Sequence, residues 1–305
     1  MAQLLACKND GTFTVLIVAD PQCENDAQWR EAERELETLT TRAEPDLVVL
    51  NGDMETNNRI PKNGFETMIH PLTERSIPFA VVNGNHDPFT DESYSLYRSF
   101  PNNMNILVDE GDECFEPTRP ANFCLPVYSH DGGRIVFAVY GMDTGDYING
   151  GWDGVTARQV AWYRKTADAL RLQAGVDIPA LLCCHIAFAE VRGMQVLDGI
   201  AEEIGAVTAK QNDKGLFPAI REKGDVKIAV FGHSHTINQI GVCDGVLLAY
   251  AGKLSTGSYH NTACRGGRVV TFSEAEPTII KTKWLASLSD AKDQAEYKSM
   301  RGDEA

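Results

Sequence analysis

Five short groups of polar residues along the chain contain the side chains that metal and hydrolytic chemistry require. They are Asp20-Pro21-Gln22, Gly52-Asp53, Gly84-Asn85-His86-Asp87, His185 and Gly232-His233-Ser234-His235. Carboxylates and amides supply oxygen ligands, imidazoles supply nitrogen ligands, and a histidine also carries a proton near neutral pH. Together the five groups predict a metal site with an acid–base group beside it.

The candidate metal ligands outnumber the four that one tetrahedral ion needs. They are Asp20, Gln22, Asp53, Asn85, His185, His233 and His235. This mixture of oxygen and nitrogen donors suits manganese, iron or zinc and disfavours calcium, which prefers oxygen alone. Two ions about 3.5 to 4 Å apart, bridged by one carboxylate, are a usual arrangement for hydrolysing phosphate esters. The donor set therefore predicts two divalent metal ions.

Each polar group follows an apolar run with the length and composition of a buried strand. The runs are 13–19, 46–50, 79–82, 180–184 and 226–231. An amphipathic helix is expected between the first two runs, over 26–42, and strand, helix and strand in this order indicate a parallel pair. Because ligands collect at the carboxyl ends of parallel strands, the polar groups are expected to meet there.

The rest of the chain predicts further helices and antiparallel strands. Helices are expected over 64–75, 91–100 and 156–173, a hairpin over 122–129 and 134–140, and an antiparallel meander over 238–242, 246–251, 268–272 and 278–284. A helix around 198–204 and a polar tail over 285–305, frayed or helical, complete the expectation.

Composition and charge limit the partners. The hydrophobic content of 43% and the charged content of 23% are ordinary for a soluble globular protein. The net charge of −15 argues against nucleic acid or an anionic membrane as the main partner. An anionic substrate would need local positive charge, which two divalent ions would supply.

The cysteines and the N-terminus point to a cytoplasmic protein. No basic region followed by a long apolar stretch opens the chain, and Cys183 and Cys184 lie side by side in an apolar run, as reduced buried thiols do. Cys114 and Cys124 flank a loop and would be able to pair in an oxidising compartment. No Cys-x-x-Cys pair is present, which argues against a thiolate zinc site.

The five polar groups, in this order, resemble the motifs of the calcineurin-like metallophosphoesterase superfamily over about residues 13–284. The stretches 151–153, 159–163 and 215–232 are most similar to its purple-acid-phosphatase-like subgroup. The resemblance implies one α/β domain over 13–284, a four-layer α/β/β/α sandwich of two mixed β-sheets flanked by helices, followed by the polar tail 285–305. One residue departs from the pattern, since Gln22 stands where a histidine is commoner, and a neutral amide is a poorer ligand than imidazole.

The resemblance also implies a role for each site residue. Asp20, Gln22 and His235 would hold the first metal, Asn85, His185 and His233 the second, and Asp53 would bridge them. His86, oriented by Asp87, would protonate the leaving alcohol or stabilise charge on the phosphoryl oxygens. A metal-bridging hydroxide would attack phosphorus in line, so no covalent intermediate is expected.

The expected function is hydrolysis of a small phosphorylated substrate, first as a phosphomonoesterase, without nucleic acid or stable membrane association. The alternatives are a phosphodiesterase acting on cyclic nucleotide or phospholipid-type diesters and a non-catalytic scaffold on the same fold. Asn57, Arg59 and His260 are candidate substrate contacts, although Arg59 and His260 also suit ordinary surface positions. Trp152 and Trp162 are interpreted as core or cap aromatics.

Overall fold

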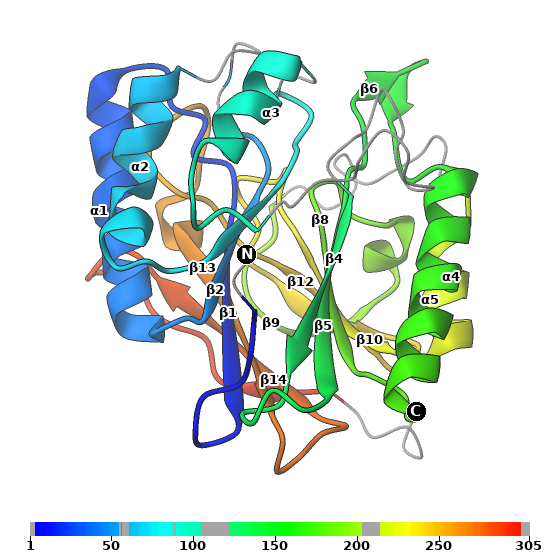
Figure 1. Ribbon diagram of the computed structural model, residues 1–305. Helices are drawn as coiled ribbons and strands as arrows, with labels where there is room; N and C mark the ends of the chain where they lie inside the picture. The colour runs from blue at the N-terminus through cyan, green and yellow to red at the C-terminus, as the bar shows by residue number, and fades with distance from the viewer. Residues whose placement is uncertain are drawn as a thin grey trace.

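Two mixed β-sheets lie face to face between two layers of helices (Figure 1). This computed structural model describes residues 4–54, 56, 61–87, 90–104, 122–202 and 214–299. Within them no helix is long and apolar enough to cross a membrane. The arrangement confirms the expected α/β/β/α sandwich.

The first sheet has the order β15-β14-β13-β1-β2-β3. Its strands are β1 (Thr12–Val18), β2 (Leu47–Asn51), β3 (Phe79–Val82), β13 (Gly266–Ser273), β14 (Ile280–Ala286) and β15 (Tyr297–Lys298). Strands β1, β2 and β3 are parallel, as the strand, helix and strand pattern predicted, and β13, β14 and β15 extend the sheet by antiparallel pairing.

The second sheet has the order β4-β5-β8-β10-β12-β11-β9. Its strands are β4 (Phe123–Tyr128), β5 (Ile135–Met142), β8 (Ala180–Cys184), β9 (Gln195–Asp198), β10 (Val226–Phe231), β11 (Ile240–Cys243) and β12 (Val246–Tyr250). The four central strands are parallel, and β4 pairs with β5 as the predicted antiparallel hairpin. A small separate hairpin joins β6 (Tyr147–Ile148) and β7 (Gly151–Trp152).

Helices cover the outer face of each sheet, as Figure 1 shows. Helices α1 (Asp26–Ala43), α2 (Lys62–Glu74) and α3 (Asp91–Arg98) pack on the first sheet, while α4 (Ala157–Ala174) and α5 (Leu216–Lys223) pack on the second. Short 3₁₀ helices occupy η1 (Ala189–Arg192) and η2 (Thr262–Cys264). Helix α1 begins because the Asn25 side chain accepts the N–H groups of Ala27 and Gln28, and α4 begins with a capping box between Thr156 and Gln159.

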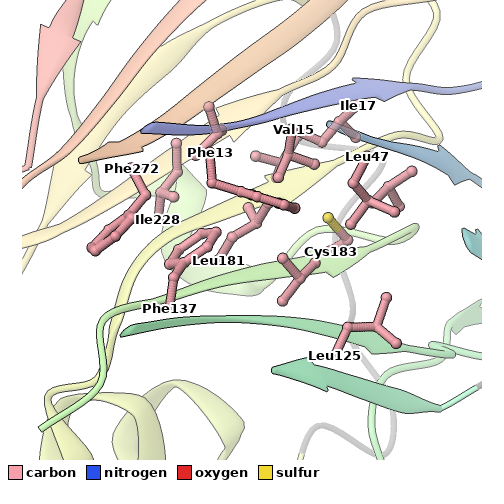
Figure 2. Close-up of a cluster of buried hydrophobic side chains, with 14 of the residues drawn as sticks. Phe13, Val15, Ile17, Leu47, Leu125, Phe137, Leu181, Cys183, Ile228 and Phe272 are labelled. Carbon is pink, nitrogen blue, oxygen red and sulfur yellow. The ribbon is translucent and has the colours of Figure 1, made fainter. Parts of the chain in front are cut away.

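The alternation of side chains along each strand divides the interior into three cores. On β1, Phe13, Val15 and Ile17 face the second sheet, and the intervening Leu16 and Val18 face α1 and α2. Figure 2 shows the core between the sheets, where Phe137 and Leu181 of the second sheet meet the side chains of β1. Because both faces of these strands are buried, the strands read as continuous apolar runs in the sequence.

Three expectations about the second half of the chain were wrong. The four late strands do not form one meander, because β11 and β12 belong to the second sheet and β13 and β14 to the first. Residues 195–198 form the edge strand β9, so no helix covers the described part of 198–204. The tail is neither frayed nor helical as far as residue 299, because β15 pairs with β14 and the Gln294 N–H donates to the Trp284 carbonyl at 3.0 Å.

The cysteines agree with the expectation of reduced, buried thiols. Cys183 and Cys184 are fully buried on β8, and both are thiols rather than halves of a disulfide. Cys124 is also a free thiol, and Cys114 lies outside the described residues.

Candidate metal centre

The candidate ligands meet at the carboxyl ends of the central strands of both sheets. Asp20 and Gln22 follow β1, Asp53 follows β2, and Asn85 follows β3, whereas His185 follows β8 and both His233 and His235 follow β10. Two groups of three buried side chains each place their donor atoms within 4.8 Å of one another. One group is Asp53, His185 and His233, and the other is Asp20, Asp53 and His235. Asp53 therefore belongs to both groups.

Three buried polar atoms in this cluster have no hydrogen-bond partner among the residues that the structure describes. They are Gln22 Oε1, Asn85 Oδ1 and His233 Nε2. A buried polar atom left unpaired costs about 1 to 3 kcal/mol, so a bound ligand would stabilise all three. Amide oxygens and imidazole nitrogens are donors that a divalent transition metal accepts, and the residues present therefore fit metal ions.

Backbone carbonyls orient two of the histidines. His185 Nδ1 lies 2.8 Å from the Asn51 carbonyl, and His235 Nδ1 lies 2.7 Å from the Tyr259 carbonyl. A carbonyl only accepts, so Nδ1 carries the hydrogen in both rings and Nε2 presents its lone pair when the ring is neutral. His185 Nε2 lies 3.2 Å from Asp53 Oδ2, and His235 Nε2 lies 3.4 Å from Asp20 Oδ1.

The charges of the cluster shift its pKa values strongly. Burial lowers the pKa of His185, but the carboxylates of Asp53 and Asp20 outweigh burial and raise it to about 10. Burial and the charge of His185 lower the pKa of His233 to about 3. Burial would raise the pKa of Asp53, yet the neighbouring His185 holds it below the usual range. A proton on His185 thus balances Asp53 at neutral pH, and a metal ion would replace that proton.

Two glycines allow the polar groups to approach one another. A Cβ atom on Gly84 would lie 2.1 Å from Asp53 Oδ1, and a Cβ atom on Gly52 would lie 2.3 Å from His185 Nδ1. Gly52 also has φ +93°, a backbone conformation that is strained for any residue with a side chain. The glycines that precede Asp53 and Asn85 are therefore needed for packing between the strand ends.

Several ligand residues have left-handed backbone conformations without being glycine. Their φ angles are 55° for Asp20, 41° for Gln22, 55° for Asp53 and 68° for His233. Such conformations cost of order 1 kcal/mol or more each and persist only where surrounding contacts hold them. The contacts include Gln22 N–H to the Asp53 carbonyl at 3.1 Å and Asp20 N–H to the Gly52 carbonyl at 3.0 Å.

The Gln22 side chain is oriented by the shared carboxylate. Its Nε2 donates to Asp53 Oδ2 at 2.9 Å, which leaves Oε1 as the buried atom without a partner. The amide oxygen is therefore the donor that this residue offers to a cation.

The expected pairing of His86 with Asp87 was wrong. The Asp87 carboxylate accepts the backbone N–H groups of Asp53, Met54 and Gly84, each at 2.8 Å, and burial raises its pKa to about 7. His86 Nδ1 instead lies 3.2 Å from the Thr56 carbonyl. Neighbours in sequence diverge here because the turn after β3 turns Asp87 inward and leaves His86 partly exposed. Asp87 thus fixes the backbone around Asp53.

The candidate substrate contacts have different outcomes. Asn57 and Arg59 lie outside the described residues. His260 lies on a loop with Nδ1 3.3 Å from the Ser258 carbonyl, and it belongs to neither ligand group. Its contact with substrate stays a prediction.

Sequence reasoning missed residues that border or support the cluster. The Trp152 ring lies edge-on to His233 with ring centroids 4.2 Å apart, so this tryptophan borders the site and is no mere core aromatic. Tyr259, half exposed, stacks on His235 at 4.2 Å. Asn51 donates to the carbonyls of Cys184 and Val230 and so ties the first sheet to the second. The one available signal was the position of Asn51, directly before Gly52-Asp53.

Curated relatives of this chain include two plant proteins. A protein of Arabidopsis thaliana named "Probable inactive purple acid phosphatase 28" is 25% identical over 293 residues, covering 84% of this chain and 73% of that protein. Another from the same plant, "Probable inactive purple acid phosphatase 14", is 24% identical over 245 residues, covering 71% of this chain and 60% of that protein.

Solved structures share the fold at low identity. A dimetal phosphatase of Danio rerio matches with a TM-score of 0.59 at 13% identity, over 95% of this chain and 99% of that one. GAP50, described as the anchor in the inner membrane complex of Plasmodium, matches with a TM-score of 0.56 at 12% identity, over 94% and 88%. One fold thus serves a phosphatase and an anchor.

The family assignment rests on a sequence match over most of the chain. Residues 13–236 match the profile described as Calcineurin-like phosphoesterase, and this range includes all five polar groups. Together with the two sheets and the cluster at their shared edge, the match confirms the resemblance, and this chain belongs to the calcineurin-like phosphoesterase family.

Proposed function

We propose that this protein hydrolyses phosphate esters at a dinuclear metal centre, with phosphomonoesters as the preferred class. The observation that carries the proposal is the position of Asp53 in both groups of candidate ligands. One carboxylate shared by two sets of donors is what a pair of neighbouring ions needs. The buried unpaired oxygen and nitrogen atoms support the same conclusion.

The ligands divide between two positions. Asp20, Gln22 and His235 would hold the first ion, Asn85, His185 and His233 the second, and Asp53 would contact both. When bound, two divalent ions supply positive charge and lower the pKa of water. The chain itself contributes the orientation of each donor atom, through the carbonyls that hold His185 and His235 and the amide contact of Gln22.

His86 would act on the leaving group. Its backbone N–H donates to Asp53 Oδ1 at 2.9 Å, which ties this residue to the shared carboxylate. Its Nδ1 faces the Thr56 carbonyl, whereas Nε2 has no partner within the described part of the chain. This partly exposed imidazole beside the ligands would, when it carries a proton on Nε2, donate that proton to the departing alkoxide.

The metal charge would allow a phosphate ester to bind to an acidic protein. Two divalent ions set against the carboxylates of Asp20 and Asp53 and a bridging hydroxide would leave a positive charge of about one, which attracts a monoester and a diester alike, so the assay below decides between them. The protein surface, at a net charge of −15, attracts no anion by itself.

A non-catalytic scaffold is the second candidate function. The two plant relatives carry the word inactive in their names, and one structural neighbour is described as an anchor. This chain nevertheless retains the shared carboxylate Asp53 and a histidine at position 86. Those two residues favour the enzyme.

The test is metal content measured by elemental analysis, together with hydrolysis of p-nitrophenyl phosphate before and after chelation. The proposal expects about two equivalents of manganese, iron or zinc and a turnover that chelation abolishes and metal restores. If bis-p-nitrophenyl phosphate were hydrolysed faster at equal metal loading, the preferred substrates would be phosphodiesters. If the protein contained no metal and adding metal restored no hydrolysis, the non-catalytic scaffold would be the remaining function.

A further inference from the structure

A segment without any candidate ligand holds the loop that carries Asp20 and Gln22. Four successive carbonyls, from residue 19 to residue 22, each accept a hydrogen bond from outside the loop. The donors are Leu254 N–H to Ala19 at 3.0 Å, Lys253 Nζ to Asp20 at 2.5 Å, Ser255 Oγ to Pro21 at 2.7 Å and Thr56 Oγ1 to Gln22 at 3.2 Å. Three of these four donors come from consecutive residues after β12.

Lys253 is the most unusual of these donors. Its side chain is fully buried, although a buried ammonium group is costly unless it is paired. Its hydrogen bond goes to a backbone carbonyl 233 residues earlier in the chain. The hydrogen bond from this buried side chain therefore restrains the backbone of Asp20.

The segment itself is anchored on helix α1 and on the start of β13. Thr256 donates through N–H and Oγ1 to Glu31 Oε2 at 2.8 and 2.6 Å, and Arg265 pairs with Glu31 and Glu35. The Lys253 backbone bonds to Cys264 and Gly266 at 2.9 Å each. The donors are therefore held in place by contacts that do not involve the loop of residues 19–22.

We propose that Lys253, Leu254 and Ser255 form a clamp that positions Asp20 and Gln22 for the first metal ion. The inference rests on the proposed metal centre and adds to it a segment that supplies no ligand. Both residues have left-handed backbone angles, which need outside contacts to persist. Lys253 is thus a positioning residue.

The clamp and the charge of Lys253 predict opposite effects of its removal. A lysine that acted through charge alone would repel a metal ion, so Lys253→Met would tighten binding. A lysine that positions Asp20 would instead weaken binding at the first position when it is replaced. The sign of the change separates the two roles.

The experiment is a Mn²⁺ titration of the metal-free full chain by calorimetry and by electron paramagnetic resonance, which distinguishes a coupled pair from a single ion. Lys253→Met is expected to weaken the first position at least about tenfold and leave the second unchanged, so that one ion binds at limiting Mn²⁺. Two ions with unchanged or higher affinity in Lys253→Met would overturn the clamp while leaving the dinuclear centre intact. A wild-type chain that binds no Mn²⁺ would overturn the proposed function, and the clamp with it.

A milder pair of variants keeps the test decisive if Lys253→Met fails to fold. Ser255→Ala removes one buried hydroxyl that donates to the loop at Pro21. Thr282→Val removes a matched buried hydroxyl on β14, which donates to the Val269 carbonyl at 2.8 Å away from the site. Ser255→Ala should weaken the first position about threefold to tenfold, and Thr282→Val should leave both positions unchanged. Equal behaviour of the two variants would refute the clamp.

Discussion

The two halves of the candidate metal centre are built in different ways. The second half, Asn85, His185 and His233, is supported from the sheets themselves, because the Asn51 carbonyl at the end of β2 holds His185 and the Asn51 side chain bonds to the ends of β8 and β10. The first half, Asp20, Gln22 and His235, depends on loops, since three donors of the 253–255 segment hold residues 19–21 and the Tyr259 carbonyl holds His235.

The two halves should therefore differ in their sensitivity to substitutions outside the ligands. Parallel pairing places the ends of β8 and β10 side by side, and the Asn51 side chain ties the end of β2 to both, so the second half follows from the packing of the two sheets. The first half needs an additional set of contacts from a distant segment. Changes outside the ligands should therefore disturb the first metal position before the second.

Removal of the shared carboxylate should empty both halves of the site. Asp53→Asn should lose metal from both positions, because the shared carboxylate belongs to both ligand groups, and turnover should fall roughly 10³-fold or more. Elemental analysis and p-nitrophenyl phosphate hydrolysis measure the two losses. The matched control is Asp46→Asn, a carboxylate that accepts the Thr14 N–H at 2.8 Å away from the cluster. Retention of two ions by Asp53→Asn would refute the bridging role.

The next effect separates chemistry from metal binding. His86→Ala should lower kcat by about 10²- to 10⁴-fold while both ions stay bound, since its ring contacts a carbonyl and lies outside both ligand groups. His70→Ala, which removes an exposed ring from α2, is the control. Loss of an ion from His86→Ala would mean that this residue supports the metals, and unchanged turnover would remove it from the mechanism.

A substitution at Gln22 should change the metal affinity of the first half alone. Gln22→His replaces an amide by a better ligand, so the first ion should bind about tenfold more tightly while the second is unchanged. Calorimetric titration with Mn²⁺ gives both affinities. Gln173→His adds a histidine at an exposed position of α4 and controls for adventitious binding. Equal tightening at both positions would show that Gln22 does not serve one ion alone.

The smallest effect concerns the support of the first half and its pH dependence. Burial raises the pKa of Glu31, but hydrogen bonds from Thr256 and Arg265 outweigh burial and hold it below its usual range. A carboxylate with a lowered folded pKa contributes stability above its unfolded pKa and loses that contribution as pH falls through the folded value. Urea unfolding at pH 7 should show Glu31→Gln less stable than the wild type by about 1 kcal/mol, with the gap closing below about pH 4. A gap that persists at pH 3 would contradict this role.

Much of the fold followed from the period and length of apolar runs. The runs ending before Asp20, Asp53, Asn85, His185 and His233 are all strands, because strands buried on both faces read as continuous apolar sequence. The period of the apolar residues does not indicate which sheet a strand joins. The crossing of the chain from β12 in the second sheet to β13 in the first was therefore not predicted. Strand β15 was missed because a two-residue edge strand has no pattern of its own.

The ligands were easier to identify than their supports. Glycine and chemistry-bearing residues at strand ends are local signals, and the structure brings five of the candidate ligands, Asp20, Asp53, His185, His233 and His235, into the two ligand groups. Lys253 gives no such signal, since its burial depends on a carbonyl 233 residues away. The Asp87 role was mistaken because adjacency in sequence says nothing about where side chains point in a turn.

Each ligand group draws members from both sheets, with Asp20 and Asp53 following strands of the first and the three histidines following strands of the second. A bound ion would thus cross-link the two layers much as a disulfide joins two chain segments, and only in the folded chain. Free metal at a hundred times its Kd would add about 2.7 kcal/mol to the free energy of unfolding for each such site. Thermal denaturation in a chelating buffer and in a metal-containing buffer would then measure two different species, and the gap between their Tm values would report metal affinity without any substrate.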